Sequence, residues 1–259
     1  MKTGKILIVG MGIVGTNLYK RLQRGCCVDK YKSNYYFNYT QVIANKDHFD
    51  IAFICVDTPA TVDFTCDISE VACALNEYDA DIYVLKSSVL PDQADFLRQL
   101  SSTKHLVFSP EYYGDTQHCN NFDFNFTILG GDKSDCIEVQ QFLQSVYDGT
   151  HTFRITDPKT ACLAKYMENS YLAMKVSFCN QFFDIAEKIG VSYEELRELF
   201  ILDPRVDPSH TFVYRDRPYW DSHCLNKDVP AIANEYDAEL LKAMITFNDG
   251  RKHKENENE

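Results

Sequence analysis

Residues 157–190 read DPKTACLAKYMENSYLAMKVSFCNQFFDIAEKIG, and the rest of the chain is organised around this stretch. Asp157 offers a side-chain oxygen as an N-cap, and Pro158 suits the first position of a helix. Gly190 is a typical C-cap residue, and no Gly or Pro interrupts the residues between 158 and 190. The stretch therefore predicts one long central helix over residues 158–189.

Apolar side chains occur on nearly every face of this predicted helix, which indicates burial on every face. In a chain of 259 residues, such a helix suggests a central strut that packs against the same helix of a second copy. Lys165 and Asn169 interrupt the apolar surface at positions i and i+4, so they share one face. Because buried polar groups need partners, this pair should face either a neighbouring acid or a bound ligand.

Charge and composition narrow the classes of function. The formal net charge is −12 and no basic stripe is present, which argues against a nucleic-acid partner. The chain has no run of eighteen apolar residues, so we expect no membrane span. The ten cysteines are irregularly spaced and include no CxxC pair, and the first residues do not resemble a secretory signal. We therefore expect reduced thiols, a cytoplasmic location and no metal site.

A glycine motif follows the first apolar run, KILIV at residues 5–9. Gly10, Gly12 and Gly15 have GxGxxG spacing, and they are followed by TNLYKRLQRG, an amphipathic helical pattern closed by Gly25. In such a motif the first glycine allows a tight turn, the second lets a pyrophosphate approach the backbone, and the third lets helix and strand pack closely. The helix N-terminus then presents N–H groups to the phosphates. This context predicts dinucleotide binding.

Asp29 follows a short apolar run at residues 26–28 and lies near the spacing expected for an acid that binds the ribose. The alternative is a solvated acid in a turn. Further apolar runs at 50–56, 81–85, 105–108 and 126–129 alternate with helical patterns. The pattern predicts an α/β fold with an N-terminal, Rossmann-like, doubly wound parallel sheet.

The predicted domain organisation follows from these elements. We expect a dinucleotide-binding domain over 1–156 and an all-helical dimerisation domain over 157–248, built on the long helix. In the second domain, a short helix over 191–200 is followed by a loop rich in Pro, Asp and aromatic residues, and then by a last helix from about Val229 to Phe247. The charged tail at 249–259 should be disordered.

Six motifs, taken in sequence order, resemble the UDP-glucose and GDP-mannose 6-dehydrogenase family. They are the GxGxxG, the VxTP at Val56–Pro59, Lys86-Ser87-Ser88, Pro110-Glu111-Tyr112, the KxxxN of the long helix followed by Lys175, and the CxxKD at Cys224–Asp228. The resemblance implies that NAD is the cofactor and that a sugar C6 alcohol is oxidised to a carboxylate, as in conversion of UDP-glucose to UDP-glucuronate for polysaccharide biosynthesis. It also implies a homodimer through residues 158–189.

The resemblance assigns candidate catalytic residues. Cys224 would be the nucleophile that forms a thiohemiacetal and then a thioester, although a cysteine by itself is more often a packing residue. Lys165 and Asn169 would stabilise the oxyanions, and Glu111 would be the general base of thioester hydrolysis. Asp228 would activate a water or steer Lys165.

Ser88 stands where the family has threonine, and its hydroxyl could hold a water. The candidate cofactor contacts lie in the glycine turn, at the ends of the following strands and beside Cys224. They are Gly10, Gly12, Ile13, Val14, Gly15, Asp29, Val56, Thr58, Pro59, Ser88, Glu111 and Lys227.

Two departures from the family pattern affect the expected substrate. The family carries a third, C-terminal domain that binds UDP, and the sequence ends before it, so the resemblance is to a truncated member. The family also has a glycine-rich approach to its cysteine, where this chain has YWDSH at 219–223. Bulky residues there should reshape the pocket, since glycines permit backbone contact with a ligand.

Two other hypotheses fit the sequence. A two-electron dehydrogenase of a smaller alcohol or hydroxy acid would use Lys165 and Asn169 but would not require the Cys224 thiol. A non-catalytic, NAD-binding dimer would require neither role.

Overall fold

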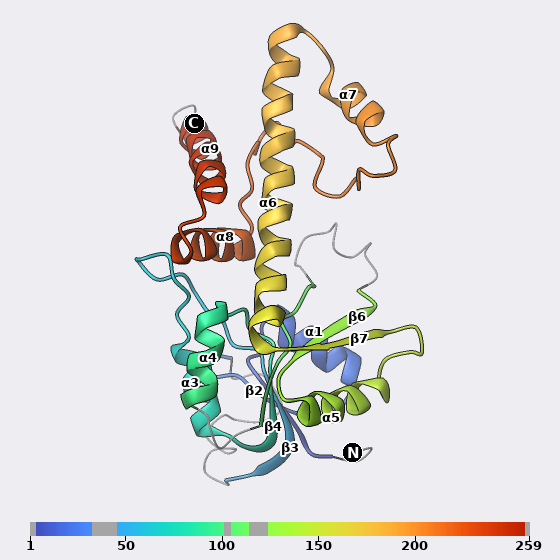
Figure 1. The fold of residues 1–259 in the computed structure, drawn as a ribbon, viewed down its shortest axis with the longest axis vertical. Coiled ribbons are helices and arrows are strands. Elements are labelled where there is room, and N and C mark those ends of the chain that lie inside the picture. The colour runs from blue at the N-terminus through green and yellow to red at the C-terminus, as the bar shows by residue number, and fades with distance from the viewer. Residues whose placement is uncertain (1–3, 33–45, 101–104, 114–123, 257–259) are drawn as a thin grey trace. The chain divides into compact units, whose positions relative to one another are not determined.

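The computed structural model describes residues 4–32, 46–100, 105–113 and 124–256 (Figure 1). The elements in chain order are β1 (Ile6–Val9), α1 (Ile13–Leu22), β2 (Cys26–Val28), β3 (His48–Ile54), α3 (Ser69–Glu77), β4 (Asp79–Leu85), α4 (Pro91–Leu100), β5 (His105–Phe108), β6 (Phe126–Gly130), α5 (Lys133–Gln144), β7 (Thr152–Thr156), α6 (Pro158–Ile189), α7 (Tyr193–Phe200), α8 (His223–Glu235) and α9 (Glu239–Asn256).

The chain divides into two compact units. The first comprises Met1–Pro59 and Cys66–Lys165, and the second comprises Ala60–Thr65 and Tyr166–Glu259. The division lies inside the long helix α6 and not before it at 156/157, because the first turns of α6 pack into the first unit. Cys162 belongs to the core of the sheet, and a Cβ added at Gly130 would lie 2.5 Å from the Cβ of Ala161.

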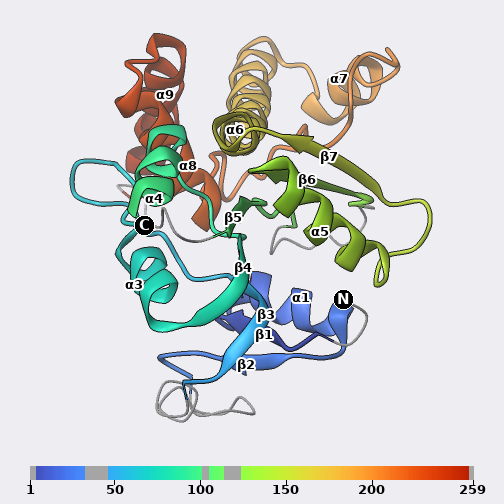
Figure 2. The same cartoon turned by 60° about the horizontal axis from the view of Figure 1, so that its bottom comes forward.

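The first unit is built on a seven-stranded sheet with the order β2-β1-β3-β4-β5-β6-β7 (Figure 2). Residues alternate between the two faces of each strand, so Leu7 and Val9 join one core while Ile6 and Ile8 join the other. Helices α3 and α4 cover the first of these faces, and α1 and α5 cover the second. The predicted α/β fold with a Rossmann-like sheet is confirmed.

Two features of the sheet differ from the sequence prediction. Strand β6 pairs with β5 in antiparallel fashion, with Phe108 opposite Gly130, while the other neighbouring strands are parallel. An antiparallel strand can start at the edge where its neighbour ends, so it needs no crossover helix. Strand β7 was not predicted, although its sequence TFRIT is rich in β-branched residues.

Helix α6 is the predicted long helix, and both predicted caps are present. The Asp157 carboxylate accepts hydrogen bonds from the backbone N–H and the hydroxyl of Thr160, at 2.9 and 2.5 Å. Gly190 adopts φ +74°, and the next residue, Val191, donates its N–H to the Ala186 carbonyl at 2.9 Å.

The prediction that α6 is buried on every face is wrong for a single chain. Seven large apolar side chains are exposed along the helix, and Met167 alone keeps 74% of its surface. We call this set the α6 stripe: Leu163, Met167, Tyr171, Phe178, Phe182, Ile185 and Ile189. Their spacing places them along one side of the helix, so the apolar content of α6 exceeds what its own chain covers.

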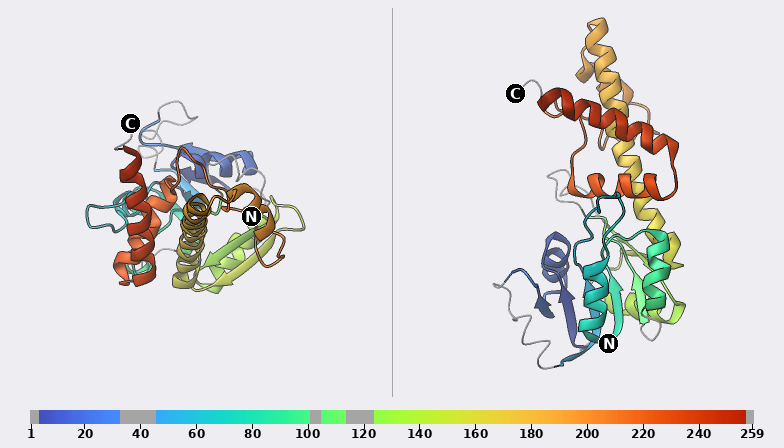
Figure 3. Two further views of the ribbon diagram at one scale, coloured as in Figure 1. Left: turned by 90° about the horizontal axis from the view of Figure 1, so that it is seen from above. Right: turned by 90° about the vertical axis from the view of Figure 1, so that its left-hand side faces the viewer.

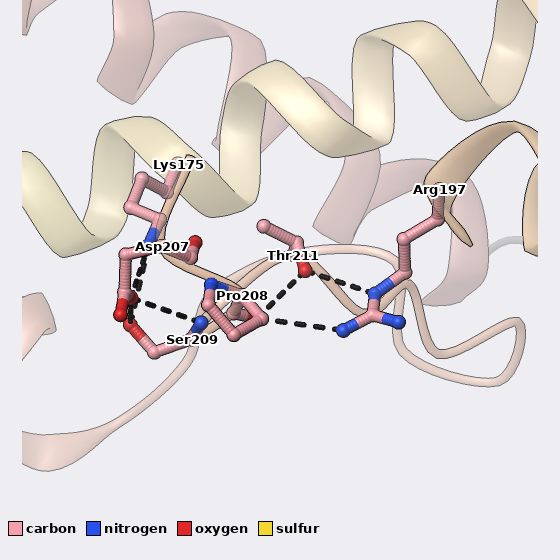
Figure 4. A network of polar contacts seen from close by, with 6 residues as sticks. All are labelled: Lys175, Arg197, Asp207, Pro208, Ser209 and Thr211. Carbon is pink, nitrogen blue, oxygen red and sulfur yellow. Dashed lines mark hydrogen bonds and ion pairs between the residues drawn. The ribbon is translucent and has the colours of Figure 1, made fainter. Parts of the chain in front are cut away.

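A polar network ties the loop after α7 back to both α6 and α7 (Figure 4). The Lys175 ammonium of α6 donates to the carbonyl and carboxylate of Asp207 at 2.9 and 3.0 Å and to the Ser209 hydroxyl at 3.1 Å. The Arg197 guanidinium of α7 donates to the Thr211 hydroxyl at 2.9 Å. Arg197 and Thr211 are both buried, so this hydrogen bond is shielded from water and helps to fix the loop.

The last part of the chain corrects two expectations (Figure 3). The single helix expected from about Val229 to Phe247 is two helices, α8 and α9, separated at Asp237, which has φ +51°. Helix α9 also continues to Asn256, so residues 249–256 are helical where the sequence predicts disorder. The Arg251 guanidinium explains part of this extension, since it donates to the Pro218 carbonyl at 2.6 Å and pairs with Asp184 of α6.

In residues 4–32, 46–100, 105–113 and 124–256, no helix combines the length and the apolar character needed to cross a membrane.

Candidate active site

The glycine turn between β1 and α1 has the geometry that the sequence predicts. Gly10 adopts φ +88°, and a Cβ there would lie 2.7 Å from the Cys55 carbonyl oxygen. A Cβ at Gly15 would lie 2.0 Å from the Gly10 carbonyl oxygen, so only glycine lets the helix pack this closely on the strand. A Cβ at Gly12, by contrast, would meet no protein atom within 4 Å. Packing therefore explains Gly10 and Gly15, while Gly12 suits the close approach of a ligand.

The N-terminus of α1 can receive an anion. Gly12 is its N-cap, no side chain caps the helix, and the first turn contains no acidic residue. Ile13 and Val14 form the start of this turn, where backbone N–H groups have no partner within the helix. This arrangement fits the pyrophosphate of a dinucleotide.

Asp29 lies at the end of β2 and is joined to the glycine turn. One of its carboxylate oxygens accepts the N–H of Met11 at 2.8 Å, and the other accepts the N–H groups of Tyr31 and Lys32 at 2.9 and 3.0 Å. Each carboxylate oxygen can accept two hydrogen bonds, so the first oxygen keeps the capacity for one more. The position fits the predicted ribose contact, which remains a prediction.

The VxTP and KSS motifs are hydrogen-bonded to each other where β3 and β4 end. The Thr58 hydroxyl donates to the Ser88 carbonyl at 2.8 Å, and the Ser87 hydroxyl donates to the Val56 carbonyl at 2.6 Å. Pro59 is exposed beside the buried Thr58. These carboxyl ends of parallel strands, next to the glycine turn, form the edge at which ligands bind in open α/β sheets.

Glu111 follows β5 at the same edge and is held by three donors. Its two carboxylate oxygens accept the N–H groups of Tyr112 and Tyr113 at 2.9 and 3.2 Å and the Lys86 ammonium at 3.3 Å. Burial raises the pKa of Glu111, but the Lys86 charge and the two N–H groups outweigh burial, and the net effect lowers this pKa. Glu111 is therefore a carboxylate at neutral pH, as a general base must be.

Lys165 and Asn169 are both buried on α6, one turn apart as predicted. The Lys165 ammonium lies 4.6 Å from the centroid of the Tyr112 ring, over its face. Within the first unit, Lys165 thus contacts the residue that follows Glu111.

The second unit contains a buried polar cluster between α6 and α8. The Asn169 amide donates to one oxygen of the Asp228 carboxylate at 2.6 Å, and the Lys227 ammonium contacts the other oxygen at 2.5 Å. All three residues are buried, with Asp228 only 2% exposed. A buried carboxylate this well satisfied fixes the rotamer of Asn169, which is the role that a preorganised oxyanion donor requires.

Cys224 is exposed in the first turn of α8, one turn before Asp228. Ser222 is the N-cap of this helix, and its hydroxyl accepts the Leu225 N–H at 3.3 Å. The positive end of the helix dipole stabilises a thiolate at such a position. The exposed Cys224 is thus not part of the core of this chain, and its role as a nucleophile stays a prediction.

The residues that hold the segment before Cys224 were not predicted. Asn248 of α9 is buried and exchanges two hydrogen bonds with the backbone of Trp220, at 2.9 and 3.1 Å. The Trp220 indole is also buried and donates to the Ser177 hydroxyl of α6 at 3.0 Å. The bulky YWDSH segment is thus anchored from both sides. The single tryptophan of the chain was a signal that could have indicated this anchor.

Comparison with known proteins finds similarity to one family. Residues 159–250 match the model of the UDP-glucose/GDP-mannose dehydrogenase family, central domain. The chain is 27% identical to a UDP-glucose 6-dehydrogenase from Rickettsia felis over 232 residues, which cover 82% of this chain and 51% of the relative. It is 26% identical to a UDP-N-acetyl-D-mannosamine dehydrogenase from Methanocaldococcus jannaschii, over 77% of this chain and 48% of the relative.

A solved UDP-D-ManNAc dehydrogenase from Pyrococcus horikoshii has the same fold, with a TM-score of 0.75 and 19% identity over 95% of this chain and 68% of that one. The chain spans about half the length of the curated relatives that it matches. The matched region contains Lys165, Asn169 and the Cys224–Asp228 motif. Residues 159–250 are therefore similar to the central domain of the UDP-glucose/GDP-mannose dehydrogenase family.

Proposed function

We propose that this chain is an NAD-dependent nucleotide-sugar dehydrogenase that oxidises a sugar C6 alcohol to a carboxylate, with a UDP-sugar as substrate. The observation that supports this most strongly is the buried cluster in which Asn169 of α6 contacts Asp228 of α8, the helix that also carries Lys227 and an exposed Cys224. A two-electron dehydrogenase has no use for an accessible thiol in that position. The relatives named above act on UDP-glucose or UDP-N-acetyl-D-mannosamine, as their names state.

The glycine turn would hold NAD. The N-terminus of α1, with Gly10, Gly12, Ile13, Val14 and Gly15, would bind the pyrophosphate, and Asp29 would bind a ribose hydroxyl. When bound, NAD+ accepts one hydride in each of the two oxidation steps. Val56, Thr58, Pro59 and Ser88, at the ends of β3 and β4, and Lys227 are the further proposed contacts.

The remaining steps belong to the protein's own residues. The Cys224 sulfur adds to the aldehyde carbon and forms a thiohemiacetal, whose oxidation gives a thioester. The Lys165 ammonium and the Asn169 amide would donate to the oxygen on which negative charge develops. Glu111 would take a proton from the water that adds to the thioester carbonyl. The carbon–sulfur bond then breaks, its electron pair returns to sulfur, and the sugar acid leaves.

A panel of nucleotide sugars tests the proposed function. We expect NADH formation, followed at 340 nm, with UDP-glucose, UDP-N-acetylmannosamine or another UDP-sugar, and at most slow formation with the corresponding free sugars. Turnover of a small alcohol or hydroxy acid in place of every nucleotide sugar would favour the two-electron alternative. NAD binding without any NADH formation would favour the non-catalytic dimer.

A pair of glycine variants tests cofactor binding. In Gly12→Ala the new methyl group meets no protein atom, so we expect a nearly unchanged melting temperature but NAD affinity lower by about 10- to 100-fold, from overpacking against the pyrophosphate. In Gly15→Ala the methyl group overlaps the Gly10 carbonyl, so the fold itself should lose about 1–3 kcal/mol. Calorimetric titration with NAD and thermal melting measure the two effects. Wild-type NAD affinity in Gly12→Ala would contradict the proposed site.

The α6 stripe is the proposed interface of a homodimer. Contiguous exposed apolar surface of this kind marks an interaction site, and a helix apolar along its length suits packing against its own copy. Replacing Met167 with glutamate would place a charge in that interface, so we expect the dimer to weaken by about 2 kcal/mol or more, roughly 30-fold. Light scattering after gel filtration measures the mass. Leu240→Glu, at an exposed apolar residue of α9, is the matched control and should stay dimeric.

A further inference from the structure

Three neighbouring strands of the first unit bring a charged cluster together at their carboxyl ends. Cys55 follows β3, Lys86 follows β4, and Ser109 and Glu111 follow β5. The Lys86 ammonium donates to the Ser109 hydroxyl at 3.3 Å and contacts Glu111 at 3.3 Å. The side chain of Lys86 is 9% exposed, so its charge has been removed from water. Neither the glycine turn nor the proposed oxyanion donors account for a lysine buried here.

A buried lysine requires a nearby anion, because removing an ammonium from water otherwise costs several kcal/mol. Glu111 is that anion. Two backbone N–H groups bind one of its oxygens and Lys86 binds the other, so the carboxylate is fixed from two directions. A base that cannot rotate keeps one lone-pair direction for a substrate water, and orientation of this kind accelerates proton transfer.

We propose that Lys86 is a positioning residue, which keeps Glu111 ionised and correctly oriented to take a proton from the water that hydrolyses the thioester. This inference rests on the proposed function of Glu111 and adds a residue to it. The direction of the Glu111 pKa, which is lowered in spite of burial, agrees with the proposal.

The other groups that face this pair cannot replace Lys86. Burial raises the pKa of the Cys55 thiol to about 12, so it is neutral near pH 7. The Ser109 hydroxyl carries no charge. Lys165 contributes a second positive charge from α6, but the contact seen for it is with the ring of Tyr112, at 4.6 Å from the centroid. The Lys86 ammonium is in an ion pair with the Glu111 carboxylate at 3.3 Å, and the proposal rests on this contact.

The test compares the pH dependence of hydrolysis in Lys86→Met and Lys86→Arg. Loss of the positive charge leaves burial opposed only by the Tyr112 and Tyr113 N–H groups, so the pKa of Glu111 should rise. The acid limb of the single-turnover rate of sugar-acid release should then move to higher pH by about 1–3 units. The first NADH burst should keep its wild-type pH profile, because the hydride step does not use Glu111. Lys86→Arg keeps the charge and should restore the wild-type limb.

Lys159→Met is the matched control. Lys159 pairs with Asp92 and Asp95 on the surface of the first unit, so the same substitution there should not move the acid limb. A Lys86→Met enzyme that is slower by one factor at every pH, with an unmoved acid limb, would overturn the proposal and leave Lys86 with a structural role only.

A carbon-13 titration of glutamate side chains makes the proposal independent of turnover. The Glu111 signal is assigned by its loss in Glu111→Gln. In the wild-type protein its pKa should lie below the ordinary value of 4.5, and a value at or above 4.5 would overturn the proposal without any Lys86 variant. If no nucleotide sugar is oxidised, the proposed function is wrong. The titration still shows whether the pKa of Glu111 is lowered, as an ion pair with Lys86 requires. Lys86→Gln is the second variant if Lys86→Met does not fold.

Discussion

Cys224→Ala is expected to abolish sugar-acid formation, lowering its rate by about 10⁴-fold or more, while the first NADH of the reaction still forms. Without the sulfur, no thiohemiacetal and no thioester can be made, and losses of this order follow removal of an enzyme's nucleophile. The aldehyde formed in the first step should then accumulate. Quenched-flow measurement of NADH and aldehyde in one turnover separates the two halves of the reaction.

Cys73→Ala is the matched control for this experiment. Cys73 is also exposed, but it lies on α3 and contacts Glu77 at 3.9 Å, so its removal should leave both NADH molecules and the acid. Full acid formation by Cys224→Ala would contradict the thioester route and favour the two-electron hypothesis.

The Asp228→Ala variant is expected to lose about 3–5 kcal/mol of its free energy of unfolding. Asp228 is almost fully buried and binds both the Lys227 ammonium and the Asn169 amide, and breaking a buried ion pair from one side costs this much. Turnover should fall as well, because Asn169 loses the contact that fixes its rotamer. Urea unfolding followed by fluorescence of Trp220, which is buried in the same unit, measures the stability.

A double variant distinguishes the charge from the packing. In Lys227→Met with Asp228→Leu, both ions are replaced by apolar groups of similar size, so most of the lost stability should return while activity stays absent. A loss below about 1 kcal/mol in Asp228→Ala would show that the cluster is solvated and would contradict the arrangement described above.

The sequence predicts most of the fold because its strongest signals are local. The strand 105–108 and the caps at Asp157 and Gly190 depend on residues that are neighbours in the chain, and the structure has them as predicted. The glycine turn is equally local, since Gly10 and Gly15 are required by contacts within one strand–turn–helix unit and with the adjacent strand.

The features that the sequence did not reveal depend on contacts between distant residues. Strand β6 pairs with β5 in antiparallel fashion. An apolar run such as FTIL predicts a strand but does not show whether that strand runs parallel or antiparallel to its neighbour. Arg251 and Lys252 anchor the end of α9 to Pro218 and Asp221, which turns an apparently disordered charged tail into helix. The exposure of the α6 stripe was not predicted. Hydrophobic character alone does not distinguish a helix face that is buried within its own chain from one that a second molecule would cover.

In the candidate site, too, the features set by local sequence were predicted, and those set by contacts between distant residues were not. Lys165 and Asn169 could be paired from helical spacing alone, and Glu111 could be placed after a strand. Sequence reasoning assigned Asp228 to a water or to Lys165, which stays a prediction, and it missed the contacts of the Asp228 carboxylate with Asn169 and Lys227. Lys86 was seen only as part of a motif, although a lysine that directly ends the buried run YVL already required a partner.

The ratio of NADH formed to sugar acid released distinguishes a four-electron from a two-electron oxidation. If Cys224 carries the thioester, wild-type protein with its UDP-sugar should give two NADH for each carboxylate released. Product identified by mass spectrometry and NADH measured by absorbance in the same sample provide this ratio. A ratio of one, with a ketone or aldehyde as the final product, would contradict the account.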